Sequence, residues 1–400
     1  MKIGVCLFDE VKIAKEAWVS IAGSSAIRIN DINELRSDVF WVTNLDYFSY
    51  RKLNLTHASN IADEQYFRTK LTSLIAEISS TTEPFEVVSR LALFLDRTHE
   101  LGEKVFGSLS NAEYRYATTL QTKLLTSSLR KQPDGNYAGD LSIAILQATQ
   151  ENQAMLGRQF AKNSKLTTFM FPRCAYANWL LKKPYPQNNT WTPVSVDKSG
   201  EVTIGIEEGS QLRGTVTFLD KLTHLEQTQR AAIFRVAVLS MDKRFTPFAQ
   251  FGSGANKYMR GWATLPEIID LARYAKLEVR DGYISDLKPL PPLPTQLTDN
   301  SPFEYSFSKG LLMENVWSAL ATPVFSPVAT FVSAVGAYMR AYDRIACGRV
   351  AAVFAQHGFQ IGSYGMGRVQ VSLRQGEEPI ASKLAIECGL LPPMRMLSNV

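Results

Sequence analysis

The segment 261–284 limits the possible folds more than any other part of the chain. It reads GWATLPEIIDLARYAKLEVRDGYI, which predicts a strand, a turn into a helix, and a returning strand. We expect Thr264 to cap the helix, Pro266 to lie in its first turn, and Glu267 to add a carboxylate at its N-terminus. This succession predicts a protein of the α/β or α+β class.

Other apolar runs predict how the rest of the chain is organised. Strands are expected at residues 2–8, 38–43, 202–206, 214–219 and 232–240. Helices are expected within residues 62–130, 141–160 and 304–353, the last including a buried helix at 321–342. The turn-rich segment QPDGNYAG, at 132–139, separates the two halves. We therefore predict domains at 1–135 and 136–400, with a proline-rich connector near 288–303.

Composition limits the kind of protein and its partners. Of the 400 residues, 45% are hydrophobic and 20% are charged, which is ordinary for a soluble globular protein. The formal net charge of +5 permits a polyanionic partner without requiring one. The four cysteines and four histidines are scattered, so we expect no disulfide framework, no metal site and no cofactor. Without a signal-peptide pattern or a run of about 18 apolar residues, we expect a cytoplasmic protein with no membrane partner.

The segment 357–373, HGFQIGSYGMGRVQVSL, predicts a β-hairpin with a short glycine-containing turn. In many metal-dependent enzymes such a turn carries acidic residues. Here the turn region 364–368 reads YGMGR and has none. Two interpretations remain open, an ordinary hairpin and a site that has lost its carboxylates.

The order of these elements resembles the palm and fingers of a family B DNA polymerase, particularly the protein-primed kind. The segment 261–284 resembles the stretch that follows the family's first catalytic motif. In SKGLLMENVWSALA, Lys309 fits the family's triphosphate-contacting lysine, although Asn315 stands two positions late and the Tyr-Gly pair is absent. The segment PVATFVSAVGAYMRAYDRIA resembles the helix before the last palm hairpin, whose Asp-Thr-Asp-Ser is replaced here by residues 365–368.

The resemblance extends weakly to the remaining motifs. Asp220, in GTVTFLDKLTHLEQ, matches the leading aspartate of the first catalytic motif, but the Tyr-Pro that should follow has no counterpart. In the N-terminal part, FDE and VFWVTNLDYFSYRKL resemble two proofreading-exonuclease motifs and supply Asp9, Glu10 and Asp46 as acids. NAEYRYATTL resembles the third exonuclease motif, but Ala117 and Thr118 stand where its aspartate should be.

The resemblance implies a degenerate exonuclease-like N-terminal domain followed by a palm-and-fingers-like region. Polymerase chemistry needs two Mg²⁺ ions on hard oxygen ligands, and glycine, methionine and arginine supply none. With Asp220 as the one vestigial candidate, we expect no catalytic residues and no metal. The hypothesis is a pseudoenzyme that binds DNA or RNA, or a protein partner in replication or defence. The alternative is a structural or assembly subunit of a virus or mobile-element complex.

Seven basic residues are candidates for contacting nucleic acid, and each has an ordinary alternative. They are Lys257, Arg260, Lys309, Arg340, Arg344, Arg349 and Arg368. Lys309 could instead cover exposed helix surface, and the arginines around Asp343 could form a solvated face. Asp220 could be a cap or an Asx-turn residue. Aromatic residues such as Trp262 could stack on bases or lie in the core.

Overall fold

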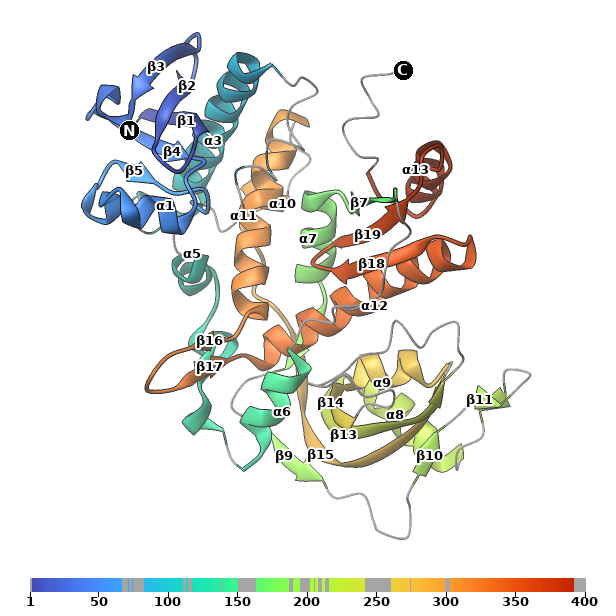
Figure 1. The fold of residues 1–400 in the computed structure, drawn as a ribbon. Coiled ribbons are helices and arrows are strands. Elements are labelled where there is room, and N and C mark those ends of the chain that lie inside the picture. Colours follow the sequence, from blue (N-terminus) through green and yellow to red (C-terminus); the bar gives the residue numbers. More distant parts are fainter. Residues whose placement is uncertain are drawn as a thin grey trace. The chain divides into compact units, whose positions relative to one another are not determined.

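The computed structural model describes most of the chain. The described residues are 2–66, 71, 74, 83–110, 113, 117–137, 139–149, 163–186, 190–194, 202–204, 206–207, 211–212, 216–241, 260–273, 275–298 and 303–391. The chain forms two compact units, one containing residues 1–123 and 293–316, the other containing residues 124–292 and 317–391 (Figure 1). The units differ from the predicted domains 1–135 and 136–400 because residues 293–316 belong with the N-terminal unit.

The N-terminal unit is built on a five-stranded sheet with the order β3-β2-β1-β4-β5. The strands are β1 (Lys2–Glu10), β2 (Lys15–Ile21), β3 (Ile27–Asp31), β4 (Val39–Thr43) and β5 (Ile61–Ala62). β1, β2 and β3 are antiparallel neighbours, whereas β4 runs parallel to both β1 and β5. The predicted strands at 2–8 and 38–43 are therefore confirmed as β1 and β4.

Helix α3 (Pro84–Phe106) packs against β1 and β2 of this sheet (Figure 1). Pro84 begins the helix, where its missing N–H costs nothing. Val88, Leu91 and Leu95 recur at helical spacing and are completely buried. The other elements of this unit are α1 (Tyr47–Lys52), α5 (Ala117–Leu124), α10 (Thr295–Thr298), the first part of α11 (Phe303–Ala321), which enters the second unit at residue 317, and the short 3₁₀ turns η1 (Ile32–Glu34) and η2 (Leu55–His57).

The second unit contains a six-stranded antiparallel sheet in which β15 is the longest strand. Its strands are β8 (Pro184–Pro186), β9 (Thr192–Val194), β10 (Val202–Ile204), β13 (Arg230–Met241), β14 (Arg260–Thr264) and β15 (Ala275–Pro289). Helices α8 (Val216–Gln227) and α9 (Leu265–Leu271) pack on β13. The core between them includes Phe234, Ile268 and Leu277. The predicted strand–helix–strand segment is confirmed as β14, α9 and β15.

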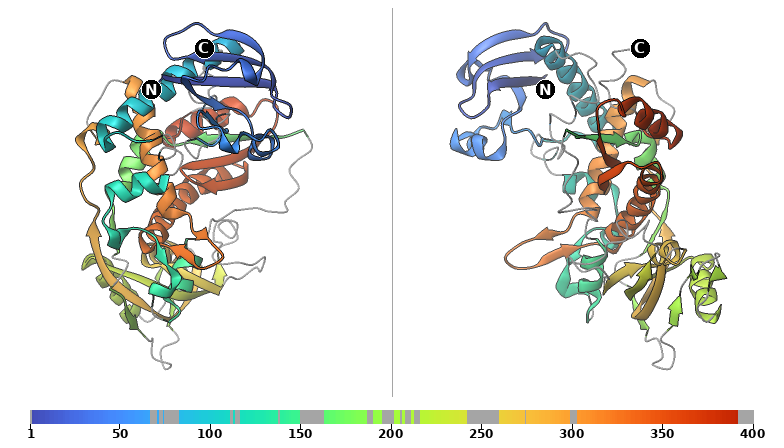
Figure 2. Two further views of the ribbon diagram at one scale, coloured as in Figure 1. Left: turned by 90° about the vertical axis from the view of Figure 1, so that its left-hand side faces the viewer. Right: turned by 45° about the vertical axis from the view of Figure 1, so that its right-hand side comes forward.

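A second, three-stranded sheet of this unit has the order β18-β19-β7 and is antiparallel throughout. Its strands are β7 (Lys165–Met170), β18 (Gln360–Gly365) and β19 (Arg368–Leu373). Helix α12 (Ala334–Gln356) packs against β18 and β19 (Figure 2). Its first turn is capped by the Ser333 side chain, which accepts a hydrogen bond from Gly336 N at 3.3 Å. The predicted hairpin at 357–373 is confirmed as β18 and β19.

Several shorter elements complete the second unit. They are α6 (Leu141–Ala148), α7 (Arg173–Leu181), α13 (Glu378–Glu387), β6 (Gln132–Pro133), β11 (Ile206–Glu207), β12 (Gln211–Leu212), β16 (Val324–Phe325), β17 (Thr330–Val332), η3 (Ser127–Leu129) and η4 (Asp134–Asn136). All four cysteines are free thiols. In the described part of the chain, no helix is long and apolar enough to cross a membrane.

The coarse prediction of a mixed α and β protein is confirmed, but three local predictions are wrong. Residues 214–219 were expected to form a strand, yet α8 begins at Val216, because the apolar residues recur at helical spacing as far as Leu225. The apolar stretch 321–342 is not one helix, since the hairpin β16–β17 precedes α12. The helix predicted at 141–160 ends at Ala148, and residues 150–162 lie outside the described part.

Candidate functional site

The turn between β18 and β19 consists of Met366 and Gly367, with Gly365 and Arg368 as the closing pair. Both turn residues have positive φ, 57° for Met366 and 67° for Gly367, as a two-residue hairpin turn of type I′ requires. Glycine adopts this conformation freely, whereas methionine pays steric strain there. The turn therefore needs support from its surroundings to remain in this shape.

Strand β7 lies on the other side of β19 and ends beside the turn. Met170 is the register partner of Arg368, and Phe171 N donates to Gly367 O at 2.8 Å. The three-stranded sheet thus brings the end of β7 to the hairpin turn. No carboxylate stands at either place, because β7 ends in Met170 and the turn region reads Gly-Met-Gly-Arg.

One carboxylate does meet the turn, and it comes from helix α12. Asp343 Oδ2 accepts from Met366 N at 2.6 Å, and Oδ1 accepts from Gly367 N at 2.8 Å. Oδ1 also accepts from the Tyr176 hydroxyl at 2.6 Å and from the Cys347 thiol at 3.4 Å. The Asp343 side chain is completely buried. Its oxygens face hydrogen-bond donors of the protein itself.

Tyr176, on α7, connects Asp343 to a group of stacked rings. Its ring lies 4.8 Å from that of Phe171, with 8° between the planes, and it also stacks on Trp179 at 5.5 Å. Burial, with the neighbouring charge of Asp343, raises the pKa of Tyr176 far above its usual value of 10.0. Burial likewise raises the pKa of the Cys347 thiol. Both groups therefore remain protonated donors to Asp343 at neutral pH.

Asp220, the predicted vestigial metal ligand, does not belong to this sheet. It lies inside helix α8, which packs on β13, and its side chain is outside the described part of the structure. The strand that pairs with β19 and ends beside the turn is β7, with Met170 opposite Arg368. The interpretation of Asp220 as a turn or cap residue after a strand is wrong for the same reason.

The predicted arginine stripe on α12 is largely internal. Arg344 donates to Glu267 Oε1 at 2.6 Å and to Ala148 O at 2.8 Å, and it is 7% exposed. Arg340 is 3% exposed, donates to Ala321 O at 3.2 Å, and contacts the Met366 sulfur. Neither guanidinium is accessible to a phosphate in this structure, and Asp343 is not a solvated neighbour.

Two of the predicted basic residues are exposed. Arg349 has a 58% exposed side chain and pairs with Asp270 at 2.5 Å. Arg368 is exposed at the start of β19, directly after the hairpin turn. Lys309, in contrast, is 2% exposed, so it neither covers helix surface nor faces solvent. Lys257 lies outside the described residues, and the side chain of Arg260 in β14 is likewise not described.

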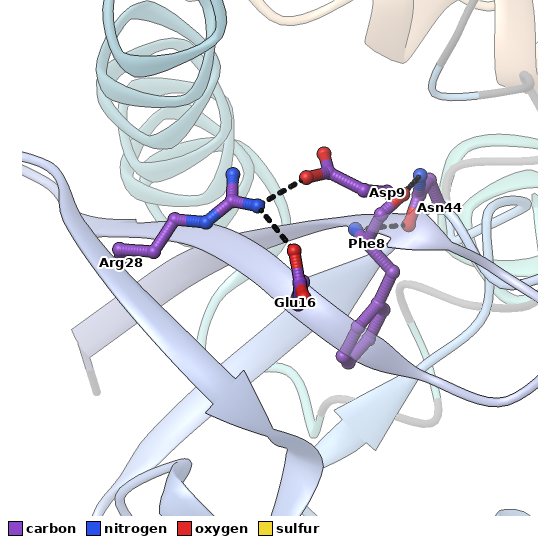
Figure 3. A network of polar contacts seen from close by, with 5 residues as sticks. All are labelled: Phe8, Asp9, Glu16, Arg28 and Asn44. Atoms are coloured by element: carbon purple, nitrogen blue, oxygen red, sulfur yellow. Dashed lines mark hydrogen bonds and ion pairs between the residues drawn. The ribbon is translucent and has the colours of Figure 1, made fainter.

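Of the acids predicted for an exonuclease-like site, Asp9 is engaged in an ion pair (Figure 3), and Glu10 is exposed at the end of β1. Arg28 on β3 donates to Asp9 at 2.5 Å and to Glu16 at 3.0 Å, and these hydrogen bonds raise the pKa of the arginine. Asn44 Oδ1 accepts from Phe8 N at 2.8 Å, and its Nδ2 donates to Phe8 O at 2.9 Å. Asp9 is therefore already paired with the positive charge of Arg28.

The remaining exonuclease positions do not add to that cluster. Asp46 caps helix α1, accepting from Ser49 N at 2.7 Å. Ala117 and Thr118 begin α5, and their side chains are not described. Within the described residues, no group of three or more His, Cys, Asp or Glu side chains is placed to hold a metal ion.

Helix α7 presents an exposed aromatic side chain beside a cation, which the sequence did not single out. Trp179 is 39% exposed, and Lys183 Nζ lies 4.8 Å from its ring centroid and 5.6 Å from that of Tyr342. Proteins that bind single-stranded nucleic acids often combine an aromatic face, on which a base stacks, with a nearby positive charge that attracts a phosphate. Trp262, which was weighed as a stacking residue, is 4% exposed and belongs to the core.

The two Mg²⁺ ions implied by the polymerase resemblance do not fit the residues at the hairpin. Magnesium requires several oxygen ligands in near-octahedral geometry. The turn and the end of β7 supply none from side chains, and the Asp343 oxygens already accept from four donors. No reaction step through such ions follows from this arrangement.

The residues that the sequence alone did not reveal are Asp343 and Tyr176. Tyr176 lies in α7, where no helix was predicted, and Asp343 lies in a predicted apolar helix; their contact joins α7 and α12 across a long stretch of chain. The signal available was an acid within a strongly apolar helix, since buried carboxylates need dedicated donors. In the sequence, Asp343 is named only as a neighbour of arginines that could form a solvated face.

No protein-family model matches this chain, and no curated protein matches it significantly. Among solved structures, it is similar to Phi29 DNA polymerase complexed with primer-template DNA, at 11% identity and a TM-score of 0.48, over 92% of this chain and 80% of that one. The same polymerase complexed with single-stranded DNA gives the same values.

Proposed function

We propose that this protein binds DNA or RNA and has no polymerase or exonuclease activity. One observation carries the inactive part of the proposal. At the hairpin turn the only carboxylate found among the described residues, Asp343, is completely buried and hydrogen-bonded to the turn itself. A site that holds two catalytic Mg²⁺ ions needs carboxylates open to the ions.

The binding part of the proposal rests on exposed arginines and on an exposed tryptophan beside a half-buried lysine. Arg368 lies directly after the turn, and Trp179 with Lys183 lies on and just after α7. The net charge of +5 favours a polyanionic partner. Arg349 belongs to the same proposal because its side chain is 58% exposed. A cytoplasmic location, a degenerate family B origin, and the exonuclease-like and palm-like character of the domains accompany this proposal as predictions.

Binding is tested by fluorescence anisotropy with labelled single-stranded DNA, primer-template DNA and single-stranded RNA, at low and at moderate salt. We expect binding at low salt that weakens steeply as salt rises, because phosphate contacts release counterions. Arg368→Ala should reduce the salt slope by about one, the value for one lost phosphate contact. Arg374→Ala is the matched control, since Arg374 is exposed just beyond the opposite end of β19.

Primer extension with Mg²⁺ and with Mn²⁺ tests the inactive part separately. We expect no nucleotide incorporation and no degradation of the primer. Robust incorporation would contradict the proposal. A protein that binds none of the three nucleic acids at low salt would instead be assigned to the alternative class, a structural or assembly subunit that contacts other proteins.

A further inference from the structure

The carboxylate of Asp343 has an unusual set of partners. It is completely buried, and its donors are two backbone N–H groups, a phenol and a thiol. Among the described residues, no lysine or arginine forms an ion pair with it. A carboxylate offers about four acceptor sites; here Oδ1 accepts from three donors and Oδ2 from one, so both oxygens are engaged by the protein.

The turn depends on the carboxylate as much as the carboxylate depends on the turn. A buried carboxylate is costly unless hydrogen bonds replace its water. Met366, at φ 57°, is strained by about 1–3 kcal/mol, and it keeps this conformation only if its neighbours fix it. The 2.6 Å bond from Met366 N to Asp343 Oδ2 is the contact that does so. The turn therefore supplies hydrogen bonds that replace water around the carboxylate, and the carboxylate holds the strained turn in its conformation.

The ring of Tyr176 packs tightly against the turn at Gly367. A Cβ atom on Gly367 would lie 3.0 Å from the Tyr176 ring, and residue 367 has the positive φ that glycine tolerates best. Tyr176 is in turn hydrogen-bonded to Asp343 and stacked on Phe171. A larger residue at position 367 would have to displace this ring.

We infer that Asp343 is an internal anion that holds the hairpin turn in place of an external ligand. The N–H groups of Met366 and Gly367, which could otherwise bind a phosphate, are bound by a carboxylate that could otherwise bind a metal ion. Two consequences follow. The order of the turn does not depend on a divalent ion, and any nucleic-acid contact at the hairpin is made by side chains such as Arg368. This inference stands on the geometry of α12 and the hairpin and does not require the proposed nucleic-acid binding.

Hydrogen exchange of the Met366 and Gly367 amides, followed by mass spectrometry or NMR on the full chain, tests the inference. In the wild-type protein, both amides should be protected equally in EDTA and in millimolar Mg²⁺. In Asp343→Asn, the side-chain amide group must face at least one N–H or O–H donor. Protection of the two amides should then fall roughly tenfold to a hundredfold, the range for losing a hydrogen bond to a charged group. Tyr176→Phe keeps the stacked ring and removes one donor, so a smaller loss is expected.

Asp9→Asn is the control, because Asp9 is 48% exposed in the other unit and should leave both turn amides unchanged. Wild-type-like protection in Asp343→Asn would overturn the inference. Protection that rises in wild type when Mg²⁺ is added would overturn it too, because an ion would then be entering the turn. If Asp343→Asn does not fold, Tyr176→Phe and the wild-type metal comparison still decide. Absence of nucleic-acid binding would refute the proposed function and leave this result untouched.

Discussion

Replacing Glu267 by glutamine should destabilise the second unit far more than the same chemical change three residues later. Glu267 is 4% exposed and accepts from Arg344, which is 7% exposed, through two guanidinium nitrogens at 2.6 Å. Its other oxygen accepts from Thr264 N at 3.4 Å, which is the capping-box bond of α9, and from Thr264 Oγ1 at 3.0 Å. Glu267→Gln therefore leaves the guanidinium of Arg344 buried without its counter-charge.

The magnitude follows from burial. Removing one partner of a buried ion pair costs about 3–5 kcal/mol, because the remaining charge stays desolvated. Asp270→Asn is the matched control, since Asp270 lies on the same helix α9 and pairs with Arg349 on the same helix α12. The Arg349 side chain is 58% exposed and can turn into water, so this change should cost about 1 kcal/mol or less.

Urea unfolding followed by circular dichroism and by tryptophan fluorescence measures both variants. A double variant, Glu267→Gln with Arg344→Met, should recover part of the lost stability, because the stranded charge is gone. If Glu267→Gln costs no more than Asp270→Asn, the buried pair does not carry the assigned energy. The reasoning would also fail if the double variant lost more free energy of unfolding than Glu267→Gln and Arg344→Met lose when their separate losses are added.

Two further predictions concern α12 and the residues that touch it. Burial raises the pKa of Tyr176, so the stability that its protonated phenol contributes is present below about pH 10 and is lost as the pH rises further. In urea titrations at alkaline pH, Tyr176→Phe should reduce the pH dependence of the free energy of unfolding by up to about 1.4 kcal/mol per pH unit. Gly336→Ala should lower the melting temperature strongly, because the added Cβ would lie 2.2 Å from Leu320 O. Gly135→Ala, with no atom within 4 Å of its added Cβ, should change little, and equal effects of the two alanines would contradict this assignment.

The elements that the sequence predicted well are those whose signals are local. Thr264 and Glu267 cap α9 because side-chain capping depends on residues three positions apart. The hairpin was predictable because Gly365 precedes its two-residue turn, Gly367 lies within it, and apolar residues alternate along β19. In both cases the physical cause lies within a few residues of the structure that it produces.

The failures have non-local or ambiguous causes. Strand β7 (Lys165–Met170) is short and half-buried, and only its pairing with β19 makes it a strand. The segment around Asp220 contains apolar residues that fit both a strand and a helix, and the longer helical spacing decides. Asp343 could not be placed, because its donors come from α7 and from the hairpin, and no local pattern encodes that meeting.

The arginines of α12 show why basic residues in a sequence overstate the surface that is available to a polyanion. Arg344 is buried in its pair with Glu267, whereas Arg349 pairs with Asp270 but keeps a 58% exposed side chain, so only one of these two charges is removed from the surface. Each such pair removes one positive and one negative charge, so the net charge of +5 is unchanged by internal pairing. The overall charge therefore remains a valid argument for a polyanionic partner, since long-range attraction depends on the sum. Individual contacts with a polyanion, in contrast, can be made only by exposed groups. At the hairpin that group is Arg368, which is exposed directly after the turn.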